Sequence, residues 1–270
     1  MADSWRRTHE WGRLTRAEIA AARDGGALAV LPVGSIEQHA DHLPVDTDTF
    51  LAVKVTEEAA ARCASPHVLI LPSPAYGFSP HHRDWPGTVS LSAATFQALV
   101  ADIAECVIGA GFDRLLLVNG HGGNRGTLTA ACTELGARGL GVGLVNYIVP
   151  GQAGWKPHLP ESFRRVGHAC AYETALQMAL RPEEAERIGS RAAGLPSRTV
   201  PPYIADGSPA PMEPVGAVWS FLFPAGNPGY FGDPAAATPA MGSSLREPTV
   251  AALAEFFAVF ARTPFLVGNA

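Results

Sequence analysis

Carboxylates and imidazoles crowd into one short stretch of this chain, GSIEQHADHLPVDTDT at positions 34–49. Glu37 and His39 stand two residues apart, so in extended backbone both side chains point to the same side. Asp48 follows where a helical pattern begins, and one loop could bring the three groups together. Carboxylate and imidazole are ligands that suit zinc, manganese or iron. The alternative is a polar surface loop in which Asp46 or Asp48 only caps the next helix.

A second candidate residue, His121, lies in the segment NGHGGN directly after an apolar run. The glycines permit a tight turn and a close approach of the backbone, which favours exposed display of the imidazole. A glycine-rich turn between strand and helix could instead cradle a phosphate. The segment lacks the lysine of a P-loop and the spacing of GxGxxG, which argues against phosphate binding.

Glu173 belongs to a predicted helix that begins near Cys170. It shares a helix face with Leu176 and Leu180, so its carboxylate is predicted to point inward. A buried carboxylate is costly unless a cation or hydrogen-bond donors meet it. Metal coordination would remove that cost, and a buried arginine partner is the alternative. His168 precedes the helix and either caps the loop or reaches the site.

The elements that position these residues alternate along the chain. Apolar runs predict strands at 27–33, 67–71, 114–118 and 140–147, and helical patterns lie between and after them. This alternation predicts an α/β fold, a three-layer sandwich whose central, mainly parallel sheet is flanked by helices on both faces. Ligands in such folds bind outside the carboxyl ends of the strands. Because Glu37, His39 and His121 all follow predicted strands, we expect them to share one site.

Composition narrows the class of protein. The 270 residues are 47% hydrophobic and 17% charged, which predicts one globular domain over 1–270 and argues against disorder. The net charge of −5 and the absence of a basic run predict no binding of nucleic acid or membrane. Four widely spaced cysteines and no apolar segment of membrane-span length predict a cytoplasmic protein with reduced thiols. The proline- and glycine-rich segment 194–242, with Trp219 and Tyr230, is predicted to be a long ordered loop or a subunit-contact arm.

With these residues assembled, the chain resembles the creatininase family of metal-dependent amide hydrolases. The resemblance covers about 27–242 and rests on five ordered motifs: GSIEQHADHLPVDTDT, YGFSPHHRDWPGT, NGHGGN, GHACAYET and GDPAAAT. It implies an α/β fold with a central parallel sheet and two divalent metal ions (zinc, manganese or iron). It also implies a homo-oligomer, often a hexamer.

The resemblance also implies roles for individual residues. Creatininase has a metal-binding glutamate two residues after the histidine of its NGH motif, where this chain has Gly123, and Glu173 is the natural substitute. Asp48 is expected to bridge the two metals. His168 is the candidate proton shuttle, whereas Ser79 and His82 are expected to position the substrate. The expected metal ligands are Glu37, His39, Asp48, His121 and Glu173. Weaker candidates are His42, Asp46 and His81.

The predicted function is a dinuclear hydrolase that cleaves the C–N bond of a small cyclic amide, formamide or similar molecule. Two metals together would lower the pKa of a water and supply hydroxide near neutral pH. Four arginines beside motif residues suggest an anionic substrate, although they could equally be solvated surface charges: Arg83, Arg125, Arg164 and Arg165. One alternative is a peptidase that trims a short peptide of the mycofactocin-precursor type. The other is a catalytically silent, metal-dependent oligomeric binding protein.

Overall fold

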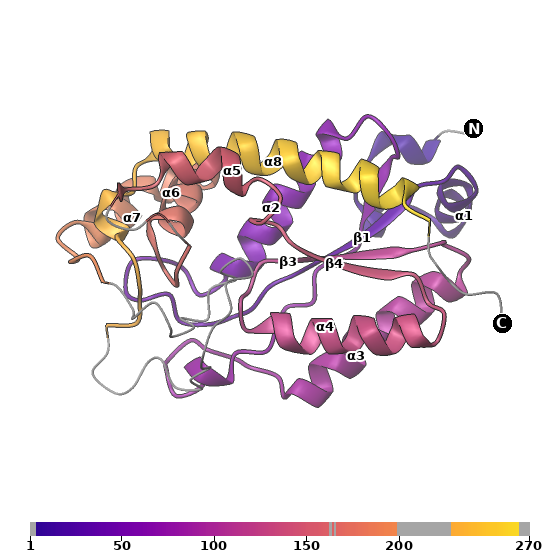
Figure 1. Ribbon diagram of the computed structural model, residues 1–270, viewed down its shortest axis with the longest axis horizontal. Helices are drawn as coiled ribbons and strands as arrows, with labels where there is room; N and C mark the ends of the chain where they lie inside the picture. Colours follow the sequence, from indigo (N-terminus) through magenta and orange to yellow (C-terminus); the bar gives the residue numbers. More distant parts are fainter. Residues whose placement is uncertain (1–3, 162–163, 165, 199–227, 265–270) are drawn as a thin grey trace.

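Four parallel strands form the central sheet of the computed structural model, which describes residues 4–161, 164, 166–198 and 228–264 (Figure 1). The strand order is β2-β1-β3-β4. Val33, Asn119 and Asn146 lie in register on three neighbouring strands, so the carboxyl ends of these strands form one common rim. The predicted parallel α/β sheet is therefore confirmed. The strands are β1 (Leu28–Val33), β2 (Val68–Ile70), β3 (Leu115–Asn119) and β4 (Val142–Asn146).

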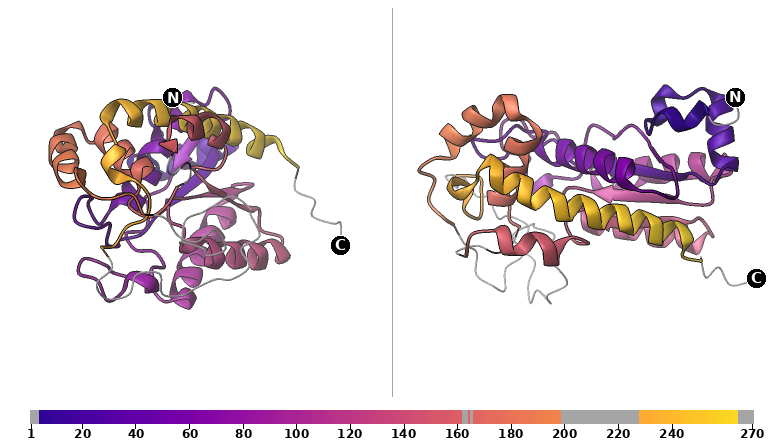
Figure 2. Two further views of the ribbon diagram at one scale, coloured as in Figure 1. Left: turned by 60° about the vertical axis from the view of Figure 1, so that its left-hand side comes forward. Right: turned by 90° about the horizontal axis from the view of Figure 1, so that it is seen from above.

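Helices cover both faces of the sheet (Figures 1 and 2). Successive strand residues point to opposite faces, and Leu116 and Val118 pack with α2, α6 and α8, whereas Leu115 and Leu117 pack with α3 and α4. The long helix α8 packs against α2, α5 and α6 on the first of these faces. The helices are α1 (Arg16–Asp24), α2 (Thr47–Arg62), α3 (Ala93–Gly109), α4 (Asn124–Ala137), α5 (Gln152–Trp155), α6 (Ala171–Leu180), α7 (Ala185–Ala192) and α8 (Pro239–Arg262).

Local sequence sets where several helices begin. The Ser92 hydroxyl accepts a hydrogen bond from the backbone N–H of Thr95 (3.1 Å) and caps α3, as its position before an apolar pattern predicts. Thr15 and Glu18 form a reciprocal capping box at the start of α1. None of the described helices is both long and apolar enough to span a bilayer. Of the predicted irregular segment 194–242, Tyr230 is buried, and Trp219 lies outside the described residues.

Candidate metal centre and active site

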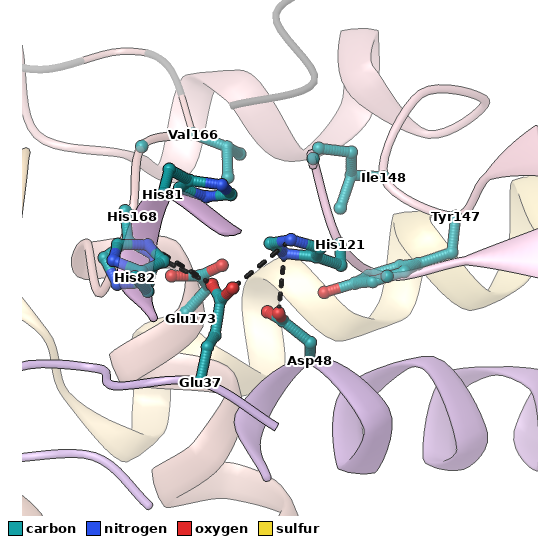
Figure 3. Close-up of a pocket in the computed structure, with 13 residues that line it drawn as sticks. Glu37, Asp48, His81, His82, His121, Tyr147, Ile148, Val166, His168 and Glu173 are labelled. Carbon is teal, nitrogen blue, oxygen red and sulfur yellow. Dashed lines mark ion pairs between the residues drawn. The ribbon is translucent and has the colours of Figure 1, made fainter. Parts of the chain in front are cut away.

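The carboxyl ends of β1, β3 and β4 surround a cavity of about 30 Å³ (Figure 3). The loops that follow these strands supply part of its wall, and a short 3-10 helix, η3 (Pro80–His82), and the start of α6 complete it. Its apolar and aromatic lining residues include Tyr147, Ile148 and Val166. Its charged and imidazole lining consists of three carboxylates and four imidazoles: Glu37, Asp48, Glu173, His81, His82, His121 and His168. Residues from four separate motifs therefore meet in one place.

Two glycines allow Asp48, in the first turn of α2, to sit against the strand ends. A Cβ atom at Gly34 would lie 2.4 Å from the backbone of Thr49, and one at Gly120 would lie 2.5 Å from the carbonyl oxygen of Asp48. Any larger residue at either position would push α2 away from β1 or β3. The carboxylate of Asp48 is buried as a result.

Each oxygen of Asp48 faces a different imidazole. Oδ1 lies 3.3 Å from His39 Nε2, and Oδ2 lies 2.8 Å from His121 Nδ1. The other ring nitrogen of each histidine donates to a backbone carbonyl, His39 Nδ1 to Glu37 (3.2 Å) and His121 Nε2 to Phe78 (3.2 Å). Because a carbonyl oxygen only accepts, these bonds fix the tautomers. The nitrogens that face Asp48 are thus the ones available to a second proton or a metal ion.

Glu37 lies between His121 on one side and His168 on the other. Its Oε2 accepts a short hydrogen bond from the Ser79 hydroxyl and lies 3.2 Å from His121 Nε2. Its Oε1 lies 3.3 Å from His168 Nδ1. The Ser79 hydroxyl also lies 2.6 Å from Ser35 Oγ and 2.9 Å from His121 Nε2. Ser79 is fully buried, so in this arrangement its hydroxyl holds Glu37, and its role in positioning a substrate stays a prediction.

Glu173 enters the site from α6. Its side chain is 9% exposed and lines the cavity, which confirms that it points inward. Its Oε2 accepts a weak hydrogen bond from the backbone N–H of Cys170 (3.4 Å) at the start of the helix. Among the described residues no arginine or lysine pairs with it, so the buried-arginine alternative has no support here.

The buried charges shift one another strongly. Burial raises the pKa of Glu37 to about 8 and that of Glu173 to about 7. Burial lowers the pKa of His39, but the charge of Asp48 outweighs it and brings that pKa to about 10. Burial is likewise outweighed at His121, where Glu37 and Asp48 bring the pKa to about 9. Burial acts to raise the pKa of Asp48, but the two imidazoles hold it well below its usual range. The cluster therefore attracts positive charge.

Divalent metal ions would supply the positive charge that this buried cluster attracts. Glu37 Oε1 and His39 Nε2 are buried, yet neither has a hydrogen-bond partner of acceptable geometry within the part of the chain that the structure describes. Leaving such groups unsatisfied is costly, and a bound cation removes the cost. The ligand atoms of Glu37, His39 and Asp48 lie within 4.8 Å of one another. Carboxylate with imidazole suits zinc, manganese or iron.

His168 faces the same carboxylate from the opposite side. Its Nε2 donates to the backbone carbonyl of Gln38 (2.8 Å), which leaves Nδ1 directed at Glu37 Oε1. Burial, and then the charge of His39, lowers the pKa of His168 well below its usual value. The ring is therefore neutral at neutral pH, with one nitrogen able to take a proton.

The side-chain amide of Gln38 orients His82. Its Oε1 accepts from Ala40 N–H (2.8 Å) and its Nε2 donates to the carbonyl of Gly229 (3.1 Å), which fixes the orientation of the amide. The second N–H then donates to His82 Nδ1 (3.1 Å), so His82 Nε2 carries a hydrogen. That nitrogen lies 3.7 Å from Glu37 Oε1. His82 lines the cavity, and its role in positioning a substrate stays a prediction.

His81, expected to be a weaker candidate, lines the cavity next to His121. Its ring is parallel to that of His121, with ring centroids 5.6 Å apart and an interplanar angle of 1°. A Cβ atom at Gly123 would lie 2.4 Å from His121 Nε2 and 2.8 Å from His81 Cε1. The place of the carboxylate that creatininase carries after its NGH motif is therefore closed in this chain by two imidazoles.

The arginines beside the motifs do not reach the cavity in the described residues. Arg83 is exposed and lies 3.9 Å from Asp84, and Arg164 pairs with Glu161 at 2.9 Å. Arg165 lies outside the described residues. The described lining contains no arginine or lysine, so the expectation of an anionic substrate gains no support from it.

Sequence comparison agrees with this geometry. A family model described as creatinine amidohydrolase, or creatininase, matches residues 12–257 of the chain. The chain belongs to the creatininase family. Within that family, the mycofactocin precursor peptide peptidase of Mycobacterium tuberculosis is 32% identical over 249 residues, which span 88% of this chain and 87% of that protein. The peptidase of the same name from Mycolicibacterium smegmatis is 33% identical over 161 residues, or 58% of this chain and 59% of that protein.

Creatinine amidohydrolase of Pseudomonas putida is 31% identical over 209 residues, which span 71% of this chain and 78% of that protein. Solved structures described as "Creatininase Mn" and as a mutant creatininase of the Zn-Zn type each superpose with a TM-score of 0.75 at 28% identity. They cover 95% of this chain and 100% of those chains. Membership of the creatininase family makes this chain an amidohydrolase, and its buried cluster is able to bind metal. The two named activities differ in substrate, one a peptide and one a small cyclic amide.

Proposed function

We propose that this creatininase-family chain is a dinuclear metal-dependent hydrolase that cleaves the C–N amide bond of a small molecule. The observation that carries the proposal is Asp48, whose two oxygens face the available nitrogens of His39 and His121. A carboxylate placed between two such imidazoles is suited to bridge two cations. Glu37, Asp48 and His121 would hold one ion, and His39, Asp48 and Glu173 the other. Bound divalent ions supply Lewis-acid chemistry, which lowers the pKa of a water molecule and polarises a carbonyl group.

The remaining residues orient groups and move a proton. Ser79 holds the Glu37 carboxylate in place through its hydroxyl. Nδ1 of the neutral His168 ring takes up the proton that the attacking water releases and passes it to the departing nitrogen, a role that its neutral state and its place on the cavity wall support. His82, held by Gln38, lines the cavity and would position the substrate.

Trimming of a short peptide is a second candidate function. The peptidase relative of Mycobacterium tuberculosis aligns over 88% of this chain at 32% identity, a longer match than the 71% for creatinine amidohydrolase. Peptide and small amide would be cleaved by the same chemistry, so the difference lies in how open the cavity mouth is.

Metal analysis combined with a substrate screen tests the proposal. Protein purified without chelators and loaded with zinc or manganese is expected to hold two ions per chain by elemental analysis. It is also expected to release product from a cyclic amide, a formamide or a short peptide in a panel that includes creatinine. Asp48→Ala serves as the inactive control. Absence of bound metal would overturn the proposal, whereas two ions without turnover on any substrate would favour the silent binding protein.

A further inference from the structure

Tyr147 is a cavity residue that the proposed chemistry does not yet use. Its backbone N–H donates to the carbonyl of Asn119 (3.1 Å), which continues the pairing of β4 with β3 one residue beyond Asn146. The indole Nε1–H of Trp155 donates to the carbonyl of Ile148 (2.7 Å) and holds the turn that follows. Tyr147 is therefore fixed at the same strand rim as His121.

The phenol ring is buried while its oxygen reaches the cavity. Tyr147 is 3% exposed and packs in the core cluster that includes Trp155 and Tyr172. It lines the cavity, and Figure 3 shows its oxygen turned towards Asp48, on the side opposite His82 and His168. No group among the described residues donates to or accepts from this hydroxyl. The hydroxyl oxygen is not one of the fully buried polar atoms that lack a partner, so it borders the open space of the cavity and can donate to a molecule that enters it.

Tyr172 shows what a structural tyrosine looks like in the same core. It is completely buried, and its hydroxyl is paired with Thr249 Oγ1 at 3.0 Å. Tyr147 lies in the same cluster without such a partner. The difference separates a phenol that stabilises the fold from one that is available to a ligand.

We infer that Tyr147 is a further catalytic residue, whose hydroxyl donates a hydrogen bond to the carbonyl oxygen of the substrate amide. The inference rests on the proposed amide hydrolysis. An amide offers a nitrogen that must gain a proton and an oxygen that gains negative charge as the carbon becomes tetrahedral. His168, on one wall of the cavity, protonates the amide nitrogen. Tyr147 lies on the opposite wall and donates a hydrogen bond to the amide oxygen. The phenol keeps its proton throughout, since its ordinary pKa is near 10 and burial raises that pKa further.

The substrate class follows from the two walls. A carbonyl oxygen must fit beside the phenol, in a cavity of about 30 Å³ whose lining also includes the apolar side chains of Ile148 and Val166. A compact acyl group meets this requirement, and a formyl or small lactam carbonyl is the simplest example. One well-placed oxyanion donor contributes about 10²–10³-fold to kcat.

The test compares Tyr147→Phe with Tyr172→Phe, two substitutions that each remove one buried phenol oxygen. Metal-loaded proteins are titrated with methylphosphonate, a tetrahedral anion that resembles the oxyanion, and binding is followed by calorimetry. Tyr147→Phe is expected to keep both its metal content and its melting temperature while binding methylphosphonate roughly 10- to 100-fold more weakly, as loss of a hydrogen bond to a charged group predicts. Tyr172→Phe is expected to melt at a lower temperature and to bind the probe as the wild type does.

Equal affinity of the wild type and Tyr147→Phe for methylphosphonate, or no binding by the wild type, overturns the inference. Metal loss in Tyr147→Phe also overturns it, because the phenol would then support a ligand. With any amide that the wild type cleaves, Tyr147→Phe should lower kcat by about 10²–10³-fold with little change in KM. Failure of the wild type to cleave any amide would count against the proposed function, and the methylphosphonate comparison still decides the role of Tyr147.

Discussion

Asp48 and Glu173 are both buried carboxylates, but their surroundings give them different tasks. Asp48 meets an imidazole at each oxygen, whereas Glu173 accepts a weak hydrogen bond from the backbone N–H of Cys170. In the proposed site Asp48 is shared by two ions and Glu173 serves one, so the two residues should respond differently to removal of the charge.

Asp48→Asn is therefore expected to lose both metal ions, and Glu173→Gln only one. Each amide keeps the shape of the side chain but is a weaker ligand, so affinity for the affected ion should fall by at least about tenfold. Elemental analysis after dialysis gives the stoichiometry, with Glu57→Gln on the exposed side of α2 as the control. Retention of two ions in Glu173→Gln would show that Glu173 is a hydrogen-bonding or catalytic group.

His168→Ala is expected to retain both ions and the fold while turnover falls by about 10²–10⁴-fold, the usual contribution of a positioned acid or base. The reason is that Nδ1 of His168 is the ring nitrogen able to exchange a proton. The surface histidine variant His158→Ala provides the control. Glu37, His82 and His168 also form a group close enough to hold a cation, so loss of metal from His168→Ala would make His168 a ligand.

At the scale of elements, one face of α6 contacts the loop between β1 and α2 and the start of α2. Thr174, Gln177 and Arg181 recur at helical spacing on that face. Each binds a residue just before or at the start of α2, and both Asp48 and Glu173 lie on the elements so joined. The three pairs are Thr174–His42 (3.0 Å), Gln177–Thr47 (3.1 Å) and Arg181–Asp46 (2.9 Å).

Arg181→Met should weaken the ion held by Glu173 several-fold more than the ion held by Glu37. The substitution removes a bidentate pair with Asp46 and a cation–π contact with Phe50 at 3.6 Å, so α6 can shift relative to α2. The pair is partly exposed, which limits the stability loss to about 1 kcal/mol. Zinc titration of metal-free protein measures both affinities, and Arg187→Met on α7 is the matched surface control. Unchanged affinity at both sites would show that the pair does not position the ligands.

At the scale of the whole molecule, folding brings several carboxylates together in one buried space. This lowers the free energy of unfolding of the metal-free protein. Between pH 7 and pH 9 the groups that titrate are those with raised pKa values. Glu37 loses its proton near pH 8 and His121 near pH 9, compared with about 4.5 and 6.5 unfolded. The folded state binds more protons than the unfolded state, so metal-free stability falls as the pH rises through this window. Histidines with lowered pKa values act only below about pH 6.5.

Metal-loaded protein is expected to be less sensitive to this rise in pH, because bound ions replace the protons that the cluster loses. The difference in melting temperature between zinc-loaded and metal-free protein should therefore grow from pH 7 to pH 9. Zinc at 100 times its dissociation constant adds about 2.7 kcal/mol of stability. Scanning calorimetry at three pH values is sufficient. A gap that shrinks as the pH rises would contradict the assigned ligands.

The number of subunits in the assembly is also a property of the whole molecule. The predicted homo-oligomer, a hexamer by family resemblance, stays a prediction. Sedimentation velocity of the metal-loaded protein at several concentrations is expected to show a single species of six chains. A monomer at all concentrations would contradict it.

The sequence by itself determined the strands, the helices and most of the acidic and imidazole residues that meet at the cavity. Glu37, His39 and Asp48 stand within one motif, and His121 follows an apolar run, so short-range spacing and the rule about strand ends were sufficient to place them on one rim. Helical periodicity was also sufficient to turn Glu173 inward. These inferences need only local geometry, because α and β periods determine which side chains share a face.

Only the tertiary structure decided which hydrogen-bond partners these residues have. The tautomer of His168 depends on a carbonyl at Gln38, and the Ser79 hydroxyl contacts Glu37, Ser35 and His121. The sequence predicts Tyr147 only as the last residue of a strand. The register of β3 with β4 places it at the cavity. Such contacts join residues far apart in the chain, and they depend on strand register and loop packing, which no local pattern encodes. The direction of a buried hydroxyl is therefore a property of the folded core.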